Sequence, residues 1–369
     1  MHLKYTVFLA CFLFGMLSHA QQTDMLEVGS PKFVQLTDQL PENLTSERSI
    51  VIVSVPSVKQ GRFEMRGDWK KLARTAHKTL RKIGVDPIAY LYKDDVNAGP
   101  EVQDAYKRLF DQRMVQNLIY LKQEGDEYTG TYHLTVTPFD KEEYVKNGQQ
   151  GWKESDQSLS TVMLRLGRQV LRQEIERSNF IIPEGPEFLG DLVAFSGTRL
   201  QNYPTRIQSL TLAVVPFEKI PVRDDVDPEL NADINAYNQE VERKNARLEE
   251  ILTKHYPYKW ELVEETDSDA LYEQGYQYAL LRLSSTGRSV KNILNYPTSA
   301  AETHYMTHTY NLEHESDLVQ IPVNASVTKY YIKQTALKDL HVGKVWDADA
   351  TWEQALQNFL FNLWQELEQ

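Results

Sequence analysis

Apolar runs alternate along this chain with segments whose apolar residues recur every three or four positions. Residues 49–55 (SIVIVSV) are apolar almost throughout, which is typical of a strand buried on both faces of a sheet. Residues 68–84 then place apolar side chains at helical spacing, with Asp68 as the amino-terminal cap and Gly84 as the terminator. A buried strand followed by an amphipathic helix indicates an α/β fold.

The same alternation continues to residue 180. Strands are predicted over 86–92, 116–122 and 129–139, and helices over 99–114 and 155–175. The first unit, over residues 48–180, therefore has the order β-α-β-α-β-β-α and is expected to contain a mixed sheet.

The second half of the chain repeats this order. LTLAVVPFEK at 210–219 matches IVIVSVPSVK at 50–59, which lies 160 positions upstream. Strands are predicted over 209–215, 259–264, 277–283 and 330–337, and helices over 228–255, 268–275 and 346–367. We therefore predict a second, diverged copy over 209–369, joined to the first by a connector over 181–208 that is rich in proline and glycine. Two unrelated α/β domains with similar patterning are the alternative.

The first 20 residues have the pattern of a secretory signal peptide. Lys4 precedes an apolar core of about a dozen residues, and the small residues Ser18 and Ala20 occupy the positions that signal peptidase reads. Cleavage is expected after Ala20, which leaves a flexible, polar lead-in over 21–47. A membrane span needs about 20 apolar residues, so no transmembrane segment is expected after cleavage. A lipoprotein signal at Cys11 is an alternative.

Composition favours export and argues against some partners. Cys11 is the only cysteine, so the mature chain has neither a disulfide nor a thiolate site, which suits a bacterial periplasmic or secreted protein. The net charge of −12 argues against nucleic acid as a partner.

No motif in the sequence specifies a reaction or a cofactor. Gly-x-Gly-x-x-Gly and Gly-x-Ser-x-Gly do not occur. The string nearest to a P-loop, SSTGRSVKN, contains only Gly287 and has Arg288 where lysine is expected. We therefore predict no catalytic residues and no cofactor.

Two aspartates are candidates for a ligand site. Asp94 and Asp95 come just after the second predicted strand, and Lys59 follows the first strand of the same sheet. Ligands of open α/β sheets bind beyond the carboxyl ends of the strands, and paired carboxylates can share a proton or a cation. The alternative is a solvated acidic loop before a helix.

Three histidines are candidates for a metal site. His304 and His308 lie on one face of a predicted strand, and His314 shares that face if the strand continues. Imidazole and nearby carboxylates suit Zn²⁺. Strand positions four apart are about 13 Å from each other, so an exposed polar strand is the alternative.

The helix predicted over 228–255 is a candidate partner-binding element. At about 1.5 Å per residue it would reach about 40 Å, which exceeds the width of a small sheet. Its apolar residues form a narrow stripe that a partner helix could cover: Leu230, Ile234, Tyr237, Val241 and Leu248. The alternative is a long helix packed on its own domain with a solvated outer face.

Two features resemble known families. The element order, with LAVVPFEK in a first strand and Gly-x-x-Tyr-x-Leu-x-x-Leu in a third strand, resembles the TolB amino-terminal domain and the CsgG-type curli-secretion domain. The carboxyl-terminal stretch, with RGDWKKLARTAHK and AYNQEVERKNARLEE, is similar to an uncharacterised family of exported proteins from Bacteroidota-type bacteria, sometimes labelled NTPase. The first resemblance implies envelope proteins that bind partners and assemble without catalysis. The second supplies no catalytic residues.

These features together predict a cell-envelope binding or assembly protein with envelope proteins as partners and no catalytic activity. The alternatives are a metal-assisted or nucleotide hydrolase, and a small-ligand sensor that binds between the two copies.

Overall fold

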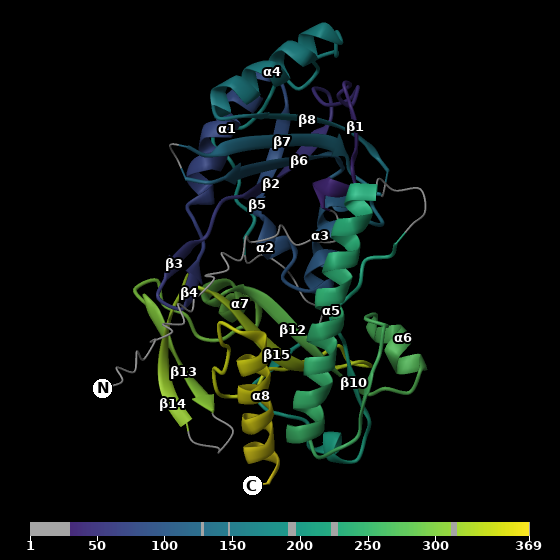
Figure 1. The fold of residues 1–369 in the computed structure, drawn as a ribbon, viewed down its shortest axis with the longest axis vertical. Helices are drawn as coiled ribbons and strands as arrows, with labels where there is room; N and C mark the ends of the chain where they lie inside the picture. The colour runs from purple at the N-terminus through teal and green to yellow at the C-terminus, as the bar shows by residue number, and fades with distance from the viewer. Residues whose placement is uncertain are drawn as a thin grey trace, which may run out of the picture.

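The structure, a computed structural model, describes residues 30–126, 129–146, 148–190, 197–222, 228–310 and 316–368 (Figure 1). It contains two six-stranded mixed sheets, one in each half of the chain, and confirms the predicted α/β fold with two similar halves. The predicted signal peptide lies outside the described residues. Within the described ranges, no helix is long and apolar enough to cross a membrane.

The first unit is built on a sheet with the strand order β1-β8-β7-β6-β2-β5. Its strands are β1 (Gln35–Thr37), β2 (Arg48–Ser54), β5 (Asp86–Tyr92), β6 (Val115–Glu124), β7 (Thr131–Pro138) and β8 (Gln150–Asp156). Its helices are α1 (Trp69–Ile83), α2 (Lys93–Val96), α3 (Pro100–Gln112) and α4 (Leu159–Arg172). A separate hairpin is formed by β3 (Val58–Gln60) and β4 (Phe63–Met65).

The second unit has the sheet order β11-β10-β12-β15-β16-β9. Read from β9 to β11, this order matches the first sheet strand for strand, so that β9 corresponds to β1 and β11 to β5. Its sheet strands are β9 (Arg199–Leu200), β10 (Leu212–Val214), β11 (Trp260–Leu262), β12 (Tyr278–Thr286), β15 (Ser326–Gln334) and β16 (Leu340–His341). Its helices are α5 (Pro228–His255), α6 (Ser268–Glu273), α7 (Gly287–Ile293) and α8 (Trp352–Leu367). An insertion carries the hairpin of β13 (His304–Tyr310) and β14 (Ser316–Pro322).

The edge strands β1 and β9 change the expected unit boundaries. β1 pairs in parallel with β8, and β9 pairs in parallel with β16. Leu44 is completely buried in the core of the first unit, so residues 30–47 belong to that unit and are not a flexible lead-in. The connector is also structured over part of its length, because Phe188 forms a parallel bridge with Tyr90 of β5.

The two similar sequence strings occupy equivalent strands but not equivalent positions. Val51 and Val53 of β2 face the helices α1 and α4, whereas Leu212 and Val214 of β10 face α5 and α8. These residues are 161 positions apart, not 160. A shift of one residue turns every side chain of a strand to the other face of the sheet. Residues of the two units therefore correspond when they face the same side of the sheet, at a spacing of 161 positions, and not when their sequence letters match.

Each sheet carries helices on its outer face. The apolar sides of α1 and α4 bury Leu72, Leu80 and Leu166 against the first sheet. The carboxyl-terminal part of α5 and the whole of α8 do the same for the second sheet, with Leu248 and Phe359 fully buried. Removal of this apolar surface from water stabilises each unit.

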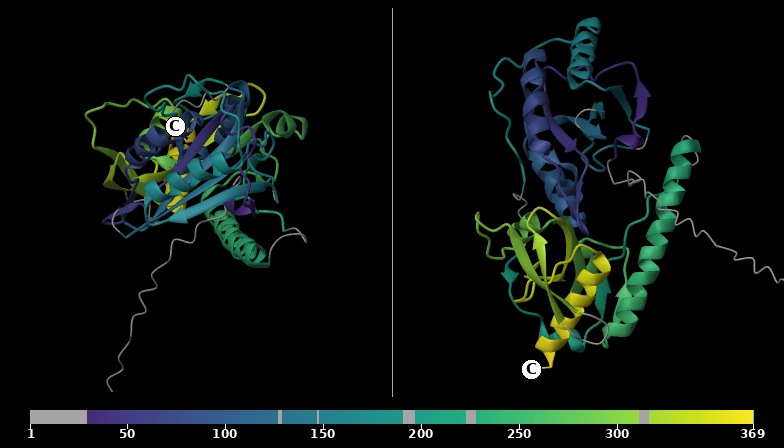
Figure 2. Two further views of the ribbon diagram at one scale, coloured as in Figure 1. Left: turned by 90° about the horizontal axis from the view of Figure 1, so that it is seen from above. Right: turned by 60° about the vertical axis from the view of Figure 1, so that its left-hand side comes forward.

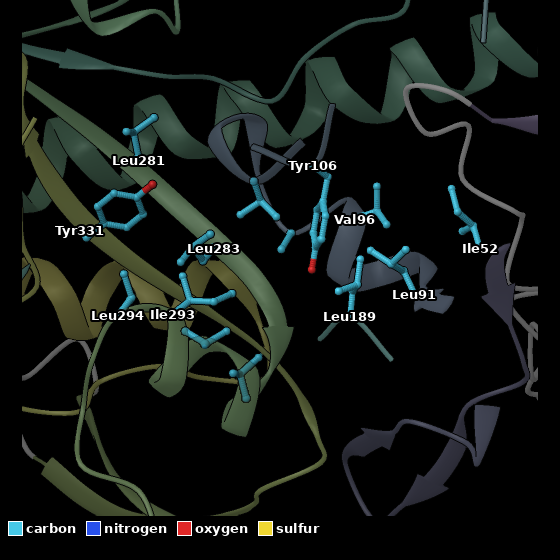
Figure 3. Packing of buried hydrophobic residues seen from close by; sticks show 14 of the residues in the cluster. Ile52, Leu91, Val96, Tyr106, Leu189, Leu281, Leu283, Ile293, Leu294 and Tyr331 are labelled. Carbon is cyan, nitrogen blue, oxygen red and sulfur yellow. The ribbon is translucent and has the colours of Figure 1, made fainter. Parts of the chain in front are cut away.

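The inner faces of the two sheets share one continuous hydrophobic core (Figure 3). The first unit contributes residues of its sheet, of α2 and α3 and of the connector: Ile52, Leu91, Val96, Tyr106 and Leu189. The second unit contributes residues of β12, β15 and the end of α7: Leu281, Leu283, Ile293, Leu294 and Tyr331. The copies are therefore fused through their interior and not merely linked by the connector.

The contact between the units also includes polar and strand-like elements. The β3–β4 hairpin reaches the second unit, where Met65 forms an antiparallel bridge with Ala325. At the start of α3, the Glu101 carboxylate accepts hydrogen bonds from the Tyr331 hydroxyl at 2.8 Å and from the Lys333 ammonium group. Burial raises the pKa of Tyr331 well above its ordinary value, so this hydroxyl remains a donor.

Helix α5 extends from the second unit towards the first (Figures 1 and 2). Near its amino-terminal end, Asp233 forms an ion pair with Lys32, which precedes β1, at 2.9 Å. The predicted partner stripe faces the protein's own interior, since Ile234, Val241 and Leu248 are at most 2% exposed. Leu230 and Tyr237 are partly buried against the shared core. This corrects the prediction that the stripe faces a partner helix, and agrees with the packed alternative.

Candidate functional site

A groove of about 1220 Å³ lies on the side of the molecule where the two units meet. Its first-unit wall is the loop between α2 and α3 with the start of α3. Its other walls come from α5, the ends of β10 and β11, parts of β12 and β15, and the start of α8. Because β10 and β11 are parallel, both reach the groove at their carboxyl ends. This is where open α/β sheets bind ligands.

At one rim of the groove, Gly99 brings the backbone of the first unit close to strand β12 of the second unit. A Cβ atom on Gly99 would lie 2.9 Å from the carbonyl oxygen of Arg282 in β12. Next to this contact, the Ser284 amide donates a hydrogen bond to the Ala98 carbonyl at 2.8 Å. The backbone of one copy is thus bonded directly to the sheet of the other, which fixes one rim of the groove.

An aromatic pair and an arginine form the centre of the groove. The rings of Phe217 and Trp352 meet edge to face, with their centroids 4.9 Å apart. The Arg282 guanidinium carbon lies 3.7 Å from the Phe217 ring centroid, and its nitrogens donate to the carbonyls of Val215 and Pro216 at 2.9 and 3.0 Å. Burial lowers the pKa of Arg282, but a guanidinium keeps its charge in proteins.

Two asparagines of α5 hold the segment that carries Phe217. The Asn245 side chain accepts from the Phe217 amide at 2.7 Å and donates to its carbonyl at 2.9 Å. Asn238 makes the same pair of bonds with Ile220, at 2.9 and 2.8 Å. The asparagines are seven residues apart and so lie on one face of the helix. Their amides replace a neighbouring strand and make this wall of the groove rigid.

The groove is more acidic than basic. Its lining carboxylates are Glu218, Glu242, Glu249, Glu264 and Glu353, and its lining cations are Lys219, Lys244 and Arg282. Lys219 is already paired with Glu242 at 2.8 Å, and the Lys244 ammonium lies 5.4 Å from the Phe217 ring. The charges that remain for a ligand are therefore mainly negative, and they favour a cationic one.

Asp95, one of the two aspartates predicted to form a ligand site, is bonded to other groups of the protein. Asp95 accepts hydrogen bonds from both terminal nitrogens of Arg66, at 2.8 and 2.7 Å, and from the Ser285 hydroxyl of the second unit at 2.7 Å. Both oxygens of the buried Asp95 carboxylate face the Arg66 guanidinium, so Asp95 is not free to share a bound ion with Asp94. Lys59 is exposed on β3 and, in the described part of the chain, forms no ion pair with either aspartate.

The predicted metal site is only partly described. His304 and His308 are both exposed and lie on the same face of β13, as expected from their spacing. His314 lies outside the described residues. Within those residues, no group of three or more histidine, cysteine, aspartate or glutamate side chains is placed to hold a metal ion. The three-histidine site therefore stays a prediction.

The sequence did not predict the centre of the groove, although it offered a ligand site between the two copies as an alternative. Tyr237 and Val241 of the predicted stripe also line the groove. Phe217, Arg282 and Trp352 come from three elements that only the tertiary structure brings together. One signal was present: Asn238 and Asn245 lie seven apart in a helix, beside its apolar stripe.

Comparison with known proteins adds little to this geometry. The chain matches no family model and no curated protein. Among solved structures, it is similar to a PelC dodecamer from Paraburkholderia phytofirmans, with 11% identity over 36% of this chain and 91% of that chain, at a TM-score of 0.21. A similarity of this size carries no argument about fold or function.

Proposed function

We propose that this protein is an exported cell-envelope binding protein without catalytic activity, and that the groove between its units holds its partner. The observation that carries this proposal is the centre of the groove, where Phe217 and Trp352 present an aromatic surface on a backbone fixed by α5. Rigid aromatic surfaces bind well because little conformational entropy is lost on contact.

The proposed location in the periplasm or outside the cell rests on the sequence alone. Residues 1–20 have the charge and apolar pattern of a secretory signal, and the remaining chain contains no cysteine. Neither feature depends on the groove, so location and binding can be tested separately.

A small-ligand sensor is the second candidate. It is favoured by the composition of the groove walls, since Asn97–Pro100 belong to the first unit and Phe217 and Trp352 to the second. A ligand in contact with both units would stabilise the fused arrangement.

The proposal is tested by photo-cross-linking from within the groove. Trp352 is replaced by benzoylphenylalanine in the full-length protein, and cells that export it are irradiated. The matched control carries the same residue in place of Trp364, which is 38% exposed and lies further along α8. We expect a discrete cross-linked protein from position 352, none from 364, and loss of the product in Phe217→Ala.

Equal products from both positions would contradict a specific partner in the groove. No protein product from position 352, together with a small molecule retained in native mass spectra and lost in Phe217→Ala, would replace the partner by the small-ligand alternative.

A further inference from the structure

Strand β11 is the terminal strand of the second sheet. Among the residues that the structure describes it pairs only with β10, with Glu261 opposite Ala213, so its other edge is open there. The Leu212 amide donates to the Lys259 carbonyl, and the Val263 amide donates to the Val214 carbonyl. In a parallel ladder, alternate residues bond to the same neighbour, so the backbone groups of Trp260 and Leu262 point away from β10.

The first unit shows what the equivalent edge can hold. There the terminal strand is β5, and the connector lies alongside it as an added parallel strand. The Tyr90 amide donates to the Glu187 carbonyl at 2.9 Å, and the Leu189 amide donates to the Tyr90 carbonyl at 3.0 Å. Between them Phe188 packs edge to face on Trp69, with centroids 5.4 Å apart. In the second unit, the described residues place no segment at the matching edge.

The end of β11 is accessible from two sides. Leu262, Val263 and Glu264 line the large groove, and the same three residues line a second hollow of about 510 Å³. A chain that runs parallel to β11 would leave the strand at its carboxyl end and so enter the groove. There Phe217 and Trp352 are available to an apolar side chain.

The charges along this route are negative. Glu249 and Glu264 line the groove, and Glu264 and Glu265 line the second hollow. Glu261 is exposed in the middle of β11. A basic segment complements this surface, whereas an acidic one is repelled.

We propose that β11 accepts an extended, basic segment of a partner protein as an added parallel strand, and that an apolar or aromatic side chain of this segment then lies against Phe217 and Trp352. Strand addition of this kind gains affinity from main-chain hydrogen bonds and specificity from pockets for alternate side chains. The inference rests on the proposed function and specifies the chemistry of the partner.

The probe is a peptide derived from the segment that occupies the matching edge. It has the sequence of residues 184–190 with Glu184→Lys and Glu187→Lys, and the peptide with both glutamates is its charge control. It is titrated into the isotopically labelled full mature chain, and amide resonances are followed by NMR. We expect the amides of Trp260 and Leu262 to shift and to become protected from exchange. The acidic peptide should bind at least about fivefold more weakly at low salt.

A matched pair of variants isolates the backbone contribution. Leu262→Pro removes an amide that points outward and leaves the ladder amides of Glu261 and Val263 in place. Leu262→Ala removes the side chain but keeps that amide. We expect about a tenfold loss of peptide affinity in Leu262→Pro beyond that of Leu262→Ala. Equal affinity of the two variants, or no shift at Trp260 and Leu262 in the native chain, would overturn the proposal.

A charge variant covers the case in which Leu262→Pro does not fold, as judged by circular dichroism. Glu264→Lys should weaken the basic peptide at least about threefold, whereas Glu42→Lys, an exposed site on the first unit, should leave it unchanged. Equal effects of the two would contradict local charge recognition.

Failure of this inference is distinguishable from failure of the proposed function. If the cross-link from position 352 persists undiminished in Leu262→Pro, the groove holds a partner but strand addition is wrong. If the chain with benzoylphenylalanine at position 352 and no other substitution gives no cross-link, the proposed protein partner of the groove is wrong.

Discussion

Arg66 and Asp95 form a two-pronged ion pair inside the protein, with side chains only 11% and 6% exposed. Arg66 follows the β3–β4 hairpin, and its guanidinium also lies 4.2 Å from the Tyr92 ring centroid. The Ser285 hydroxyl of the second unit completes the arrangement. Two residues of the first copy are thus held by a hydroxyl of the second.

Replacement of Arg66 tests this ion pair as part of the contact between the units. Arg66→Met leaves the Asp95 carboxylate buried without its cation, so we expect a loss of about 3–5 kcal/mol in the free energy of unfolding. Urea denaturation followed by tryptophan fluorescence measures it. Lys59→Met, at an exposed lysine of the same hairpin, is the control and should change stability by less than about 0.5 kcal/mol. Equal stability of the two variants would contradict the buried role of the pair.

The interior position of the α5 stripe predicts a large effect from a small truncation. Ile234 is completely buried in the shared core, so Ile234→Ala should cost about 2–5 kcal/mol of folding free energy. Gln239→Ala, at an exposed position of the same helix, should be nearly neutral. The midpoint temperature of thermal denaturation measures this loss. An unchanged midpoint for Ile234→Ala would contradict the interior position of the stripe and favour a partner surface.

The amide pair between Asn245 and Phe217 predicts a local change in dynamics. Asn245→Ala removes both hydrogen bonds and leaves the partly buried Phe217 amide without this partner. An unpaired buried donor costs about 1–3 kcal/mol, so we expect faster hydrogen exchange at Phe217. Exchange at Ile220, which Asn238 holds, should change less. Mass spectrometry of deuterated peptides distinguishes the two segments, and unaltered exchange over 216–219 would contradict the bracing role of α5.

The amino-terminal cap of α6 predicts that the stability of the fold depends on pH in the acidic range. Hydrogen bonds from the amides of Ala270 and Asp269 lower the pKa of Asp267 below its ordinary value of 3.8. A lowered carboxyl pKa stabilises the fold above the unfolded value, and this contribution is lost as the pH falls through the folded value. The stability difference between the native chain and Asp267→Asn should therefore be constant from about pH 5 upward and shrink below 3.8. Urea midpoints measured from pH 3 to pH 6 report it, and a difference that grows on acidification would refute the assignment.

The elements that the sequence predicts well are those whose burial is strongly patterned. The strand at 86–92 and the helix at 228–255 are observed with the predicted bounds. The strands β8 and β16 were missed: β8 carries polar and charged residues, and β16 is only two residues long. Such strands are held by backbone pairing with their neighbours, which leaves little trace in the hydrophobic pattern.

The candidate sites were harder to predict from the sequence than the strands and helices. The sequence correctly places Asp94 and Asp95 at the carboxyl end of a strand, but it contains no sign that Arg66 would reach Asp95. Nor can spacing along the chain bring Phe217 to Trp352, since helix α5 and most of the second sheet separate them in sequence. Contacts that depend on how two units pack are set by long-range geometry, which local periodicity does not encode.

The core shared by the two sheets has a consequence for how this chain can be divided. Two similar halves joined by a connector suggest two modules, each of which could be cut out and used alone. Here Leu91 of one copy and Leu283 of the other belong to the same buried cluster, so either half expressed alone would expose a broad apolar face to water. Neither half can thus be removed without exposing this face on the other, so we expect the two halves to unfold together in one cooperative transition.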